Sequence, residues 1–305
     1  MPNFRGIVPP VITPMHTDGS VDFESLDRLV DHLIDGGMHG LFILGSSGQV
    51  AYLTDSERDE VTARCVKRAA GRVPVLVGTP DFTARRIAET AKRAEDLGAD
   101  AVVVTAPLYA LNDVAEIERH FRIIAEAVSV PVFAYNVPVR VHSYLGLATL
   151  MNLAKDGVIA GVKDSSGDDV GFRRLVAANR AAGHPLELLT GHEVMCDGMF
   201  LLGADGAVPG LGNVDPAGYA RMWDAAQAGD WVAVRDEQDR IARLFEIAFV
   251  PQGRSGDAGG IGAFKQALAS LGIIASGAMP APMEPLTSDD VAGIETILRE
   301  VGLLA

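Results

Sequence analysis

Eight short apolar runs recur along the first three quarters of the chain, and each is followed by a longer segment whose apolar residues have helical spacing. Runs that are apolar almost throughout are typical of parallel strands that helices cover on both faces. The predicted strands are residues 6–13, 40–44, 73–77, 101–105, 132–135, 158–162, 186–189 and 206–208. The predicted helices that follow them are residues 22–35, 54–70, 83–97, 114–128, 145–154, 171–181, 194–202 and 216–228.

Eight consecutive strand–helix units favour one α/β fold, the (β/α)8 TIM barrel. A doubly wound open sheet is the alternative, but it requires a Gly-rich turn after its first strand, and residues 7–14 contain none. Beyond Gly229 the pattern is helical only, over residues 231–249, 261–271 and 288–304. We therefore predict a barrel over residues 1–229 and a C-terminal helical extension, packed on the barrel, over residues 230–305.

Composition excludes several classes of function. The net charge of −14 argues against binding to nucleic acid or to an anionic membrane, because both require a basic surface. Cys65 and Cys196 lie far apart and offer neither a disulfide framework nor a metal-binding spacing. The first 14 residues lack the features of a secretion signal, and no apolar run reaches the ~18 residues of a membrane span. We expect a cytoplasmic protein without a bound metal.

Lys163 is the residue with the clearest chemical potential. A (β/α)8 barrel builds its active site at the carboxyl ends of its strands, and Lys163 is the only lysine at these predicted ends. An ammonium group in apolar surroundings is costly, so such a lysine tends to lose its proton. A neutral lysine is a nucleophile that forms a Schiff base with a carbonyl compound. The alternative is a structural lysine that pairs with Asp164 or Asp168.

Other strand ends carry groups that suit the same chemistry. The loop Gly45-Ser46-Ser47-Gly48 offers backbone N–H groups and two hydroxyls for a carboxylate, although such loops are also common as plain turns. Tyr135 ends the preceding strand, so it can face the same opening as Lys163 and move protons, or it can simply bond to the backbone. Arg140 can hold a carboxylate in bidentate fashion, or it can be a solvated surface arginine.

Five short motifs, taken in order, resemble the dihydrodipicolinate synthase and N-acetylneuraminate lyase superfamily of pyruvate-dependent Schiff-base enzymes over essentially the whole chain. These motifs are Pro10-Val11-Ile12-Thr13-Pro14, Gly45-Ser46-Ser47-Gly48-Gln49, Tyr135-Asn136-Val137-Pro138, Gly161-Val162-Lys163-Asp164 and Leu202-Gly203-Ala204-Asp205-Gly206. Each motif is short, but their joint order and spacing are specific.

The resemblance implies catalytic roles by position. Lys163 is similar to the imine-forming lysine of the superfamily, and Tyr135 is similar to its proton-relaying tyrosine. Ser46 and Ser47 match the hydroxyl pair that binds the pyruvate carboxylate, and Ser47 is expected to join the proton relay. Tyr109 resembles the tyrosine that completes the relay from a neighbouring subunit, which implies a homo-oligomer, a tetramer or a dimer.

The resemblance also implies a substrate-binding set. Arg140 resembles the arginine that binds the carboxylate of the second substrate in the synthases. Gly45 and Gly48, together with Ser46 and Ser47, form the loop for the pyruvate carboxylate, and Pro209 at the end of the eighth predicted strand is included with them.

Several positions depart from the pattern of the synthases. Gln49 replaces the usual glutamate of the loop, and Ser47 replaces a threonine that is common there. Leu108 stands where many synthases have a second tyrosine. The segment from Gly253 to Gly262 is unusually rich in glycine. These departures leave the imine chemistry intact but bear on the identity of the second substrate.

We therefore predict a pyruvate-dependent Schiff-base lyase or synthase, in which Lys163 condenses with pyruvate or another 2-keto acid and the product attacks an aldehyde. The covalent imine is the electron sink, so no cofactor is expected. Arg140 favours a condensation like that of dihydrodipicolinate synthase. The departures favour a 2-keto-3-deoxy sugar acid aldolase or dehydratase, similar to N-acetylneuraminate lyase. Two further hypotheses are a non-catalytic barrel that binds keto acids and a phosphosugar enzyme that uses residues 209–213.

Overall fold

The computed structural model of the chain describes residues 3–305. Residues 1 and 2, which belong to the predicted barrel and to the segment searched for a secretion signal, lie outside the described residues. Eight parallel strands form one sheet in the order β1-β8-β7-β6-β5-β4-β3-β2. The strands are β1 Gly6–Ile7, β2 Leu41–Ile43, β3 Val75–Gly78, β4 Ala101–Thr105, β5 Val132–Asn136, β6 Gly161–Asp164, β7 Glu187–Thr190 and β8 Gly206–Ala207.

The two edges of this sheet meet and close a barrel. The N–H of Val11 donates to the carbonyl of Phe42 at 2.8 Å, and the N–H of Phe42 donates to the carbonyl of Pro9 at 3.0 Å. Regular pairing of the first strand is confined to Gly6 and Ile7, because Pro9 and Pro10 have no N–H to give to a ladder. The predicted strand over residues 6–13 is therefore longer than the observed one.

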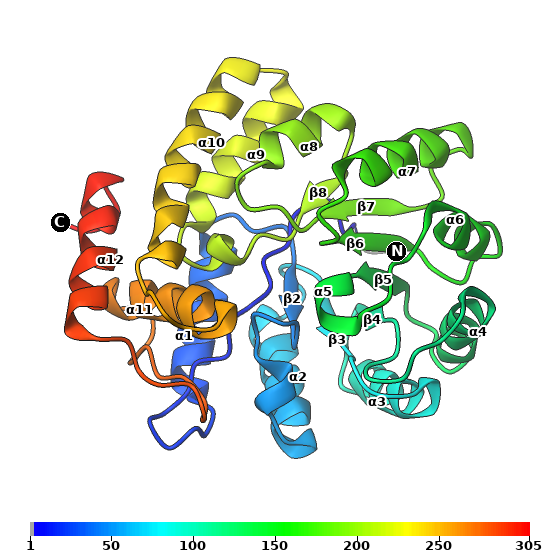
Figure 1. Cartoon of the computed structure of the whole chain (residues 1–305), viewed down its shortest axis with the longest axis horizontal. Helices are drawn as coiled ribbons and strands as arrows, with labels where there is room; N and C mark the ends of the chain where they lie inside the picture. Colours follow the sequence, from blue (N-terminus) through cyan, green and yellow to red (C-terminus); the bar gives the residue numbers. More distant parts are fainter. Residues whose placement is uncertain (1–2) are drawn as a thin grey trace.

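Helices surround the barrel and continue beyond it (Figure 1). Those within the barrel region are α1 Phe23–Asp35, α2 Asp55–Ala69, α3 Ala84–Asp96, α4 Val114–Ala125, α5 Pro138–Val141, α6 Leu147–Lys155, α7 Asp169–Ala181, α8 Cys196–Leu202 and α9 Pro216–Ala228. The extension contains α10 Trp231–Phe245, α11 Gly262–Ser270 and α12 Ser288–Glu300. No helix within residues 3–305 combines the length and the apolar composition that crossing a bilayer needs.

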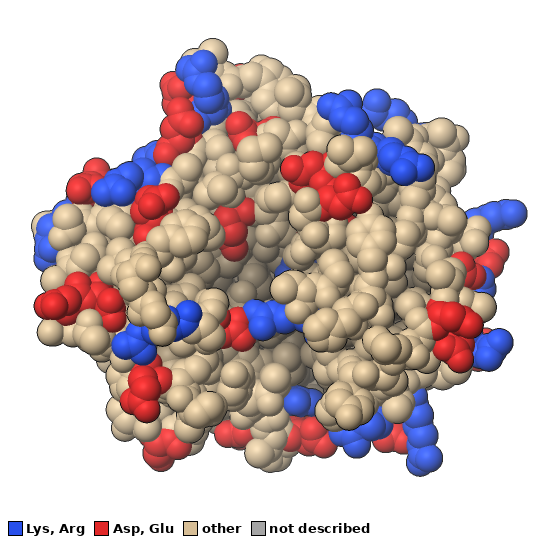
Figure 2. Space-filling view, viewed as in Figure 1, with Lys and Arg blue, Asp and Glu red and all other residues tan. Residues whose placement is uncertain are grey.

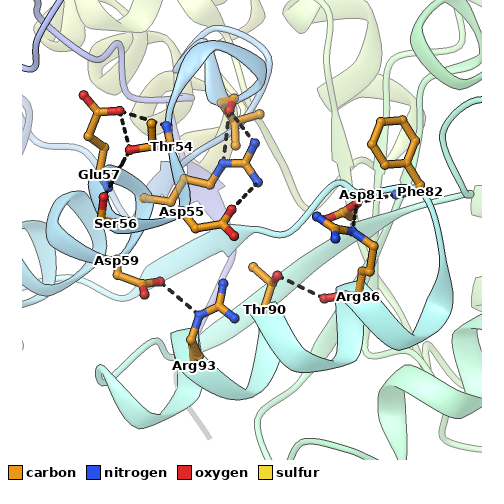
Figure 3. A network of polar contacts seen from close by, with 12 residues as sticks. Thr54, Asp55, Ser56, Glu57, Asp59, Asp81, Phe82, Arg86, Thr90 and Arg93 are labelled. Atoms are coloured by element: carbon orange, nitrogen blue, oxygen red, sulfur yellow. Dashed lines mark hydrogen bonds and ion pairs between the residues drawn. The ribbon is translucent and has the colours of Figure 1, made fainter.

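Aspartate and threonine side chains begin most of these helices. Eight of the helices have such a cap accepting a hydrogen bond from an N–H of the first turn, at Asp22, Thr54, Thr83, Asp113, Asp168, Asp215, Asp230 and Thr287. The predicted capping box of Thr54 and Glu57 is present. Figure 3 shows this box and the neighbouring contact between Arg93 of α3 and Asp59 of α2, at 3.3 Å.

The helical extension lies against the barrel. Helix α10 packs along α9 and against α8, and α11 packs against α12. The guanidinium of Arg240 pairs with Asp215 at the start of α9. The (β/α)8 barrel with a C-terminal helical extension is thus confirmed, whereas the boundary at Gly229 stays a prediction.

Strand β6 begins three residues later than predicted. The N–H of Val158 bonds to the carbonyl of Leu153 and so belongs to the end of α6. Regular pairing starts at Gly161, opposite Phe133 of β5. As a result, Lys163 lies within the strand, where its neighbours on β5 and β7 fix its position.

Candidate active site

Three side chains from neighbouring strands lie in one row inside the barrel. Thr105 of β4 pairs in register with Tyr135 of β5, and Tyr135 pairs with Lys163 of β6. Because partners on parallel strands point to the same face, all three share the interior of the barrel near the carboxyl ends of the strands. The nitrogen of Lys163 lies 4.2 Å from the centre of the Tyr135 ring and 4.7 Å from that of Phe42.

The space below Lys163 is filled by an aromatic side chain. A Cβ placed on Gly161 would lie 2.2 Å from the ring of Phe133, so only glycine fits at that position. Phe133 in turn meets Phe4 edge to face, with ring centres 5.2 Å apart. This packing forms an apolar floor, above which Lys163 is only 6% exposed.

The residues that alternate with this row point outward and hold the strand ends together. The side-chain amide of Asn136 donates to Asp164 at 2.9 Å, and its oxygen accepts from the N–H of Leu145 at 3.0 Å. Asp164 also accepts from the hydroxyl of Ser166 at 2.7 Å, and Asp168 caps helix α7. Both aspartates are therefore engaged in structural contacts away from the barrel interior.

The phenol of Tyr135 is in a polar cluster that suits proton transfer. Burial acts to raise its pKa, but the positive charge of Lys163 and hydrogen bonding to Ser165, Lys163 and Ser46 outweigh burial, so the pKa of Tyr135 lies below its ordinary value. Ser46 rather than Ser47 is thus the loop hydroxyl that the structure brings to Tyr135. Ser47 faces another way, toward Gly210.

The loop from Gly45 to Gly48 is bent by unusual backbone geometry. Leu44 and Gln49, which flank it, both have a φ of 55°, a left-handed conformation that is uncommon for residues other than glycine. The hydroxyl of Thr13 donates to the carbonyl of Gly48 at 2.7 Å and fixes the turn. Within residues 3–305, the N–H groups of residues 46, 47 and 48 have no hydrogen-bond acceptor. Such free donors are suited to a carboxylate.

A hollow opens above this row at the carboxyl ends of the strands. Its walls are mainly apolar, with Phe42, Leu44, Val50, Leu108, Val137 and Val141 among them, and Tyr135, Thr105 and Ser46 also line it. Figure 2 shows the depression at the middle of this face, with acidic and basic groups close to one another beside it. A second hollow, lined by Ser47 and Glu193, adjoins the first.

Arg140 is placed at the mouth of the hollow by a helix that sequence reasoning missed. The short helix α5 begins at Pro138, directly after β5, and carries Arg140 in its last turn. Its guanidinium already binds a carboxylate, because Nη1 donates to Asp257 at 3.0 Å and Nη2 donates to the other oxygen. The expected partner of Arg140 was a substrate carboxylate, and the structure instead shows Asp257 of the chain itself in that position.

Glu193, like Asp257, lies at the site but had no role predicted from the sequence. Its carboxylate accepts from the N–H of Gly210 at 2.6 Å and of Leu211 at 3.0 Å. Burial raises the pKa of Glu193, although these N–H donors and the charge of Lys163 act against it. Neither Glu193 nor Asp257 had a sequence signal of its own, apart from the Gly-rich composition around Asp257.

Four predicted site residues, Lys163, Gly48, Tyr109 and Pro209, are not among the described residues that line either hollow. Lys163 nevertheless lies beside Tyr135, which lines the first hollow. Tyr109 is 93% exposed, with a φ of 69°, and it does not line either hollow in the described residues of this chain. Pro209 is buried at the start of the loop after β8, where its carbonyl accepts from the N–H of Gly212 at 3.2 Å. No group of three or more histidine, cysteine, aspartate or glutamate residues with a metal-binding arrangement occurs within residues 3–305.

Comparison with known proteins gives one consistent result. The model of the dihydrodipicolinate synthetase family matches residues 3–301. The 4-hydroxy-tetrahydrodipicolinate synthase of Phenylobacterium zucineum (strain HLK1) is 33% identical over 305 residues, which is 99% of this chain and 99% of that protein.

Two solved structures illustrate the likeness in three dimensions. The dihydrodipicolinate synthase of Bacteroides thetaiotaomicron superposes with a TM-score of 0.91 at 32% identity and covers 98% of this chain and 99% of that one. A prophage protein of E. coli K12, solved in complex with pyruvate and belonging to the dihydrodipicolinic acid synthase family, has a TM-score of 0.91 at 29% identity, with coverage of 98% and 99%.

Proposed function

The chain belongs to the dihydrodipicolinate synthetase family, and we propose that it is a pyruvate-dependent Schiff-base lyase or synthase of the class I aldolase type. The reaction class comes from the family. The assignment of its steps to residues of this chain is our proposal, and it is supported chiefly by the position of Lys163 beside Tyr135 inside the barrel.

The loop and Lys163 together provide a binding site for pyruvate. The N–H groups of residues 46, 47 and 48, which have no acceptor within residues 3–305, hold its carboxylate. After it gives up its proton, the amine of Lys163 adds to the ketone carbon, and the carbonyl oxygen takes up a proton. Loss of that oxygen as water then leaves a protonated imine, which carries the positive charge that the later steps need.

Tyr135 is the proposed carrier of protons in these steps. Its phenol donates a proton to the departing oxygen and receives one back through the hydroxyl of Ser46, which takes the relay role expected of Ser47. Removal of a proton from the methyl carbon of the imine gives an enamine. That carbon attacks the carbonyl carbon of an aldehyde, whose C=O π bond opens so that its oxygen takes up a proton and becomes a hydroxyl. Addition of water to the new imine then releases the product and restores Lys163. Cleavage follows the same steps in reverse. The protonated imine accepts the electron pair, so these steps need no metal or organic cofactor.

The test is reduction of the imine with borohydride in the presence of pyruvate. We expect intact mass and peptide mapping to show one reduced adduct, on Lys163, and the Lys163→Ala variant to lose it. Lys265 is a matched control because it is also buried, and the Lys265→Met variant is expected to keep the adduct. An unmodified Lys163 at saturating pyruvate would contradict the proposal and would favour the non-catalytic barrel.

The aldolase or dehydratase alternative remains as a second candidate, because Asp257 occupies the guanidinium that a synthase would use for its second substrate. The phosphosugar hypothesis has less support. The loop after β8 would have to bind phosphate through its N–H groups, and Glu193 already accepts from those of Gly210 and Leu211.

We also propose that the protein is a homo-oligomer. Tyr109 is 93% exposed and Leu111 is 84% exposed on the same loop, which is an arrangement that contact with a second copy would cover. In such an assembly Tyr109 would approach the site of a neighbouring subunit, as the family resemblance implies. Sedimentation velocity measures the state of assembly directly.

A further inference from the structure

The ion pair between Arg140 and Asp257 joins two distant parts of the chain across the mouth of the hollow. Arg140 lies in α5 after strand β5, and Asp257 opens a π-helical turn, residues 257–261, in the C-terminal extension. Both residues line the apolar hollow and the adjoining one. Tyr135, whose ring centre lies 4.2 Å from the nitrogen of Lys163, also lines the apolar hollow, so a molecule that approaches Lys163 through this hollow meets the pair.

The geometry of the pair leaves the guanidinium occupied. Two N–H groups of Arg140 donate to the two oxygens of Asp257, which is the bidentate form in which arginine would bind the carboxylate of a substrate. Hydrogen bonding to Asp257 also raises the pKa of Arg140. Asp257 belongs to the same chain as Arg140, so its effective concentration at the guanidinium is on the order of millimolar. A dissolved carboxylate must compete with it for Arg140.

Within residues 3–305, no other lysine or arginine lining the two hollows replaces the guanidinium that Asp257 occupies. Among their lining residues in the described part of the chain, Arg140 is the only lysine or arginine, whereas Asp257 and Glu193 supply two carboxylates. A substrate carboxylate would therefore lose its cation and face like charge, and discrimination of this repulsive kind is an effective source of specificity.

Neutral polar atoms are nevertheless available inside the hollow. The hydroxyl of Thr105 and the side-chain oxygen of Gln49 are buried and have no hydrogen-bond partner within residues 3–305, and both residues line the apolar hollow. Thr105 is 5% exposed and stands in the row of Tyr135 and Lys163. Such groups can bind the carbonyl or hydroxyl oxygen of an uncharged molecule, whose carbon skeleton would contact the apolar walls.

We propose that Asp257 is a specificity-determining residue, which occupies Arg140 and thereby selects an uncharged aldehyde with an apolar body as the second substrate. This inference rests on the proposed function, since it concerns the aldehyde that the enamine on Lys163 attacks. It distinguishes this chain from an enzyme whose free arginine captures a carboxylated aldehyde.

The experiment compares pairs of aldehydes that differ in a carboxylate, benzaldehyde with 4-carboxybenzaldehyde and butanal with 4-oxobutanoate. Formation of the aldol product from pyruvate is followed by chromatography, and kcat/KM is obtained for each aldehyde. We expect the wild-type protein to prefer the uncharged member of each pair. The Asp257→Asn variant should increase the ratio of kcat/KM for the charged over the uncharged member by about tenfold or more, because Arg140 becomes free.

Two further variants make the outcome decisive. Asp257→Ser removes the same carboxylate with a smaller side chain and serves if the asparagine variant does not fold. Asp169→Asn is a control, since that aspartate pairs with His192 and lines neither hollow. A wild-type preference for the charged aldehydes, or an unchanged ratio in both Asp257 variants, would overturn the inference while the borohydride adduct on Lys163 still forms. Absence of that adduct would overturn the proposed function and this inference with it.

Discussion

Lys265 offers a quantitative test of how this structure tolerates a buried amine outside the proposed site. It lies in α11 with 0% exposure, and its nitrogen donates to the carbonyl of Ala278 at 3.0 Å. Within residues 3–305 it forms no ion pair with a carboxylate. Burial lowers the pKa of Lys265 from its ordinary 10.5 to about 7.

Because burial lowers the pKa of Lys265, the stability of the folded protein depends on pH. Between about pH 7 and pH 10.5 the unfolded chain binds a proton at Lys265 that the folded chain does not, so the free energy of unfolding rises with pH. Below pH 7 the amine is charged in both states and the full penalty of burial is present. A shift from 10.5 to about 7 corresponds to a penalty of about 4–5 kcal/mol there, which falls to about 2 kcal/mol at pH 9.

Replacing Lys265 by methionine removes this penalty but also leaves the carbonyl of Ala278 without its donor, which costs about 1–3 kcal/mol. We expect Lys265→Met to be more stable than the wild type at pH 6, by about 2 kcal/mol or more. The difference should shrink by about 2–3 kcal/mol on going to pH 9. Urea unfolding at a series of pH values measures both quantities.

The exposed Lys155 provides the control, since Lys155→Met should change stability by a similar amount at every pH. A constant difference between Lys265→Met and the wild type from pH 6 to pH 9 would refute the argument. It would mean that the amine keeps its proton in the folded protein through a contact that the burial of Lys265 does not reveal.

Two other predictions concern the site and its support. Tyr135→Phe should lower kcat by about 10²–10⁴-fold, because the phenol is the proposed proton carrier, while the KM for pyruvate changes little; steady-state kinetics would contradict the role if kcat were retained. Gly161→Ala should destabilise the fold by about 1–3 kcal/mol in urea unfolding, because the new methyl would lie 2.2 Å from the Phe133 ring. Its control is Gly198→Ala, where the nearest atom is the terminal methyl of Met195 at 3.4 Å, and equal losses in the two variants would contradict the packing argument.

The elements with strong local signals could be read from the sequence. Helix α9 over Pro216–Ala228 and strand β4 over Ala101–Thr105 have the predicted bounds, and α2 begins at its predicted capping box. These signals lie within a few residues of one another, since a cap bonds to its own first turn and an apolar run reports burial of its own strand. Eight such units determine the closed barrel, because few other folds bury eight parallel strands.

The sequence also determined which residue could carry the chemistry. Lys163 is the one lysine at the predicted strand ends, and Tyr135 stands at the end of the strand before it. Once β5 and β6 are neighbouring strands of a barrel, these two residues pair in register. Fold and candidate nucleophile were therefore accessible without coordinates.

The partners of the groups around that lysine were decided by the tertiary structure alone. Arg140 meets Asp257 across 117 positions of sequence, and Glu193 meets the loop after β8, although no motif links either pair. Which hydroxyl of the loop faces Tyr135 depends on the left-handed residues that bend the loop. Local periodicity indicates only whether a residue is buried. Closure of the barrel and packing of the extension against it determine which side chains, in the interior or at the mouth of the hollow, contact each other. The choice of second substrate that we propose rests on one of these contacts, the pair of Arg140 and Asp257.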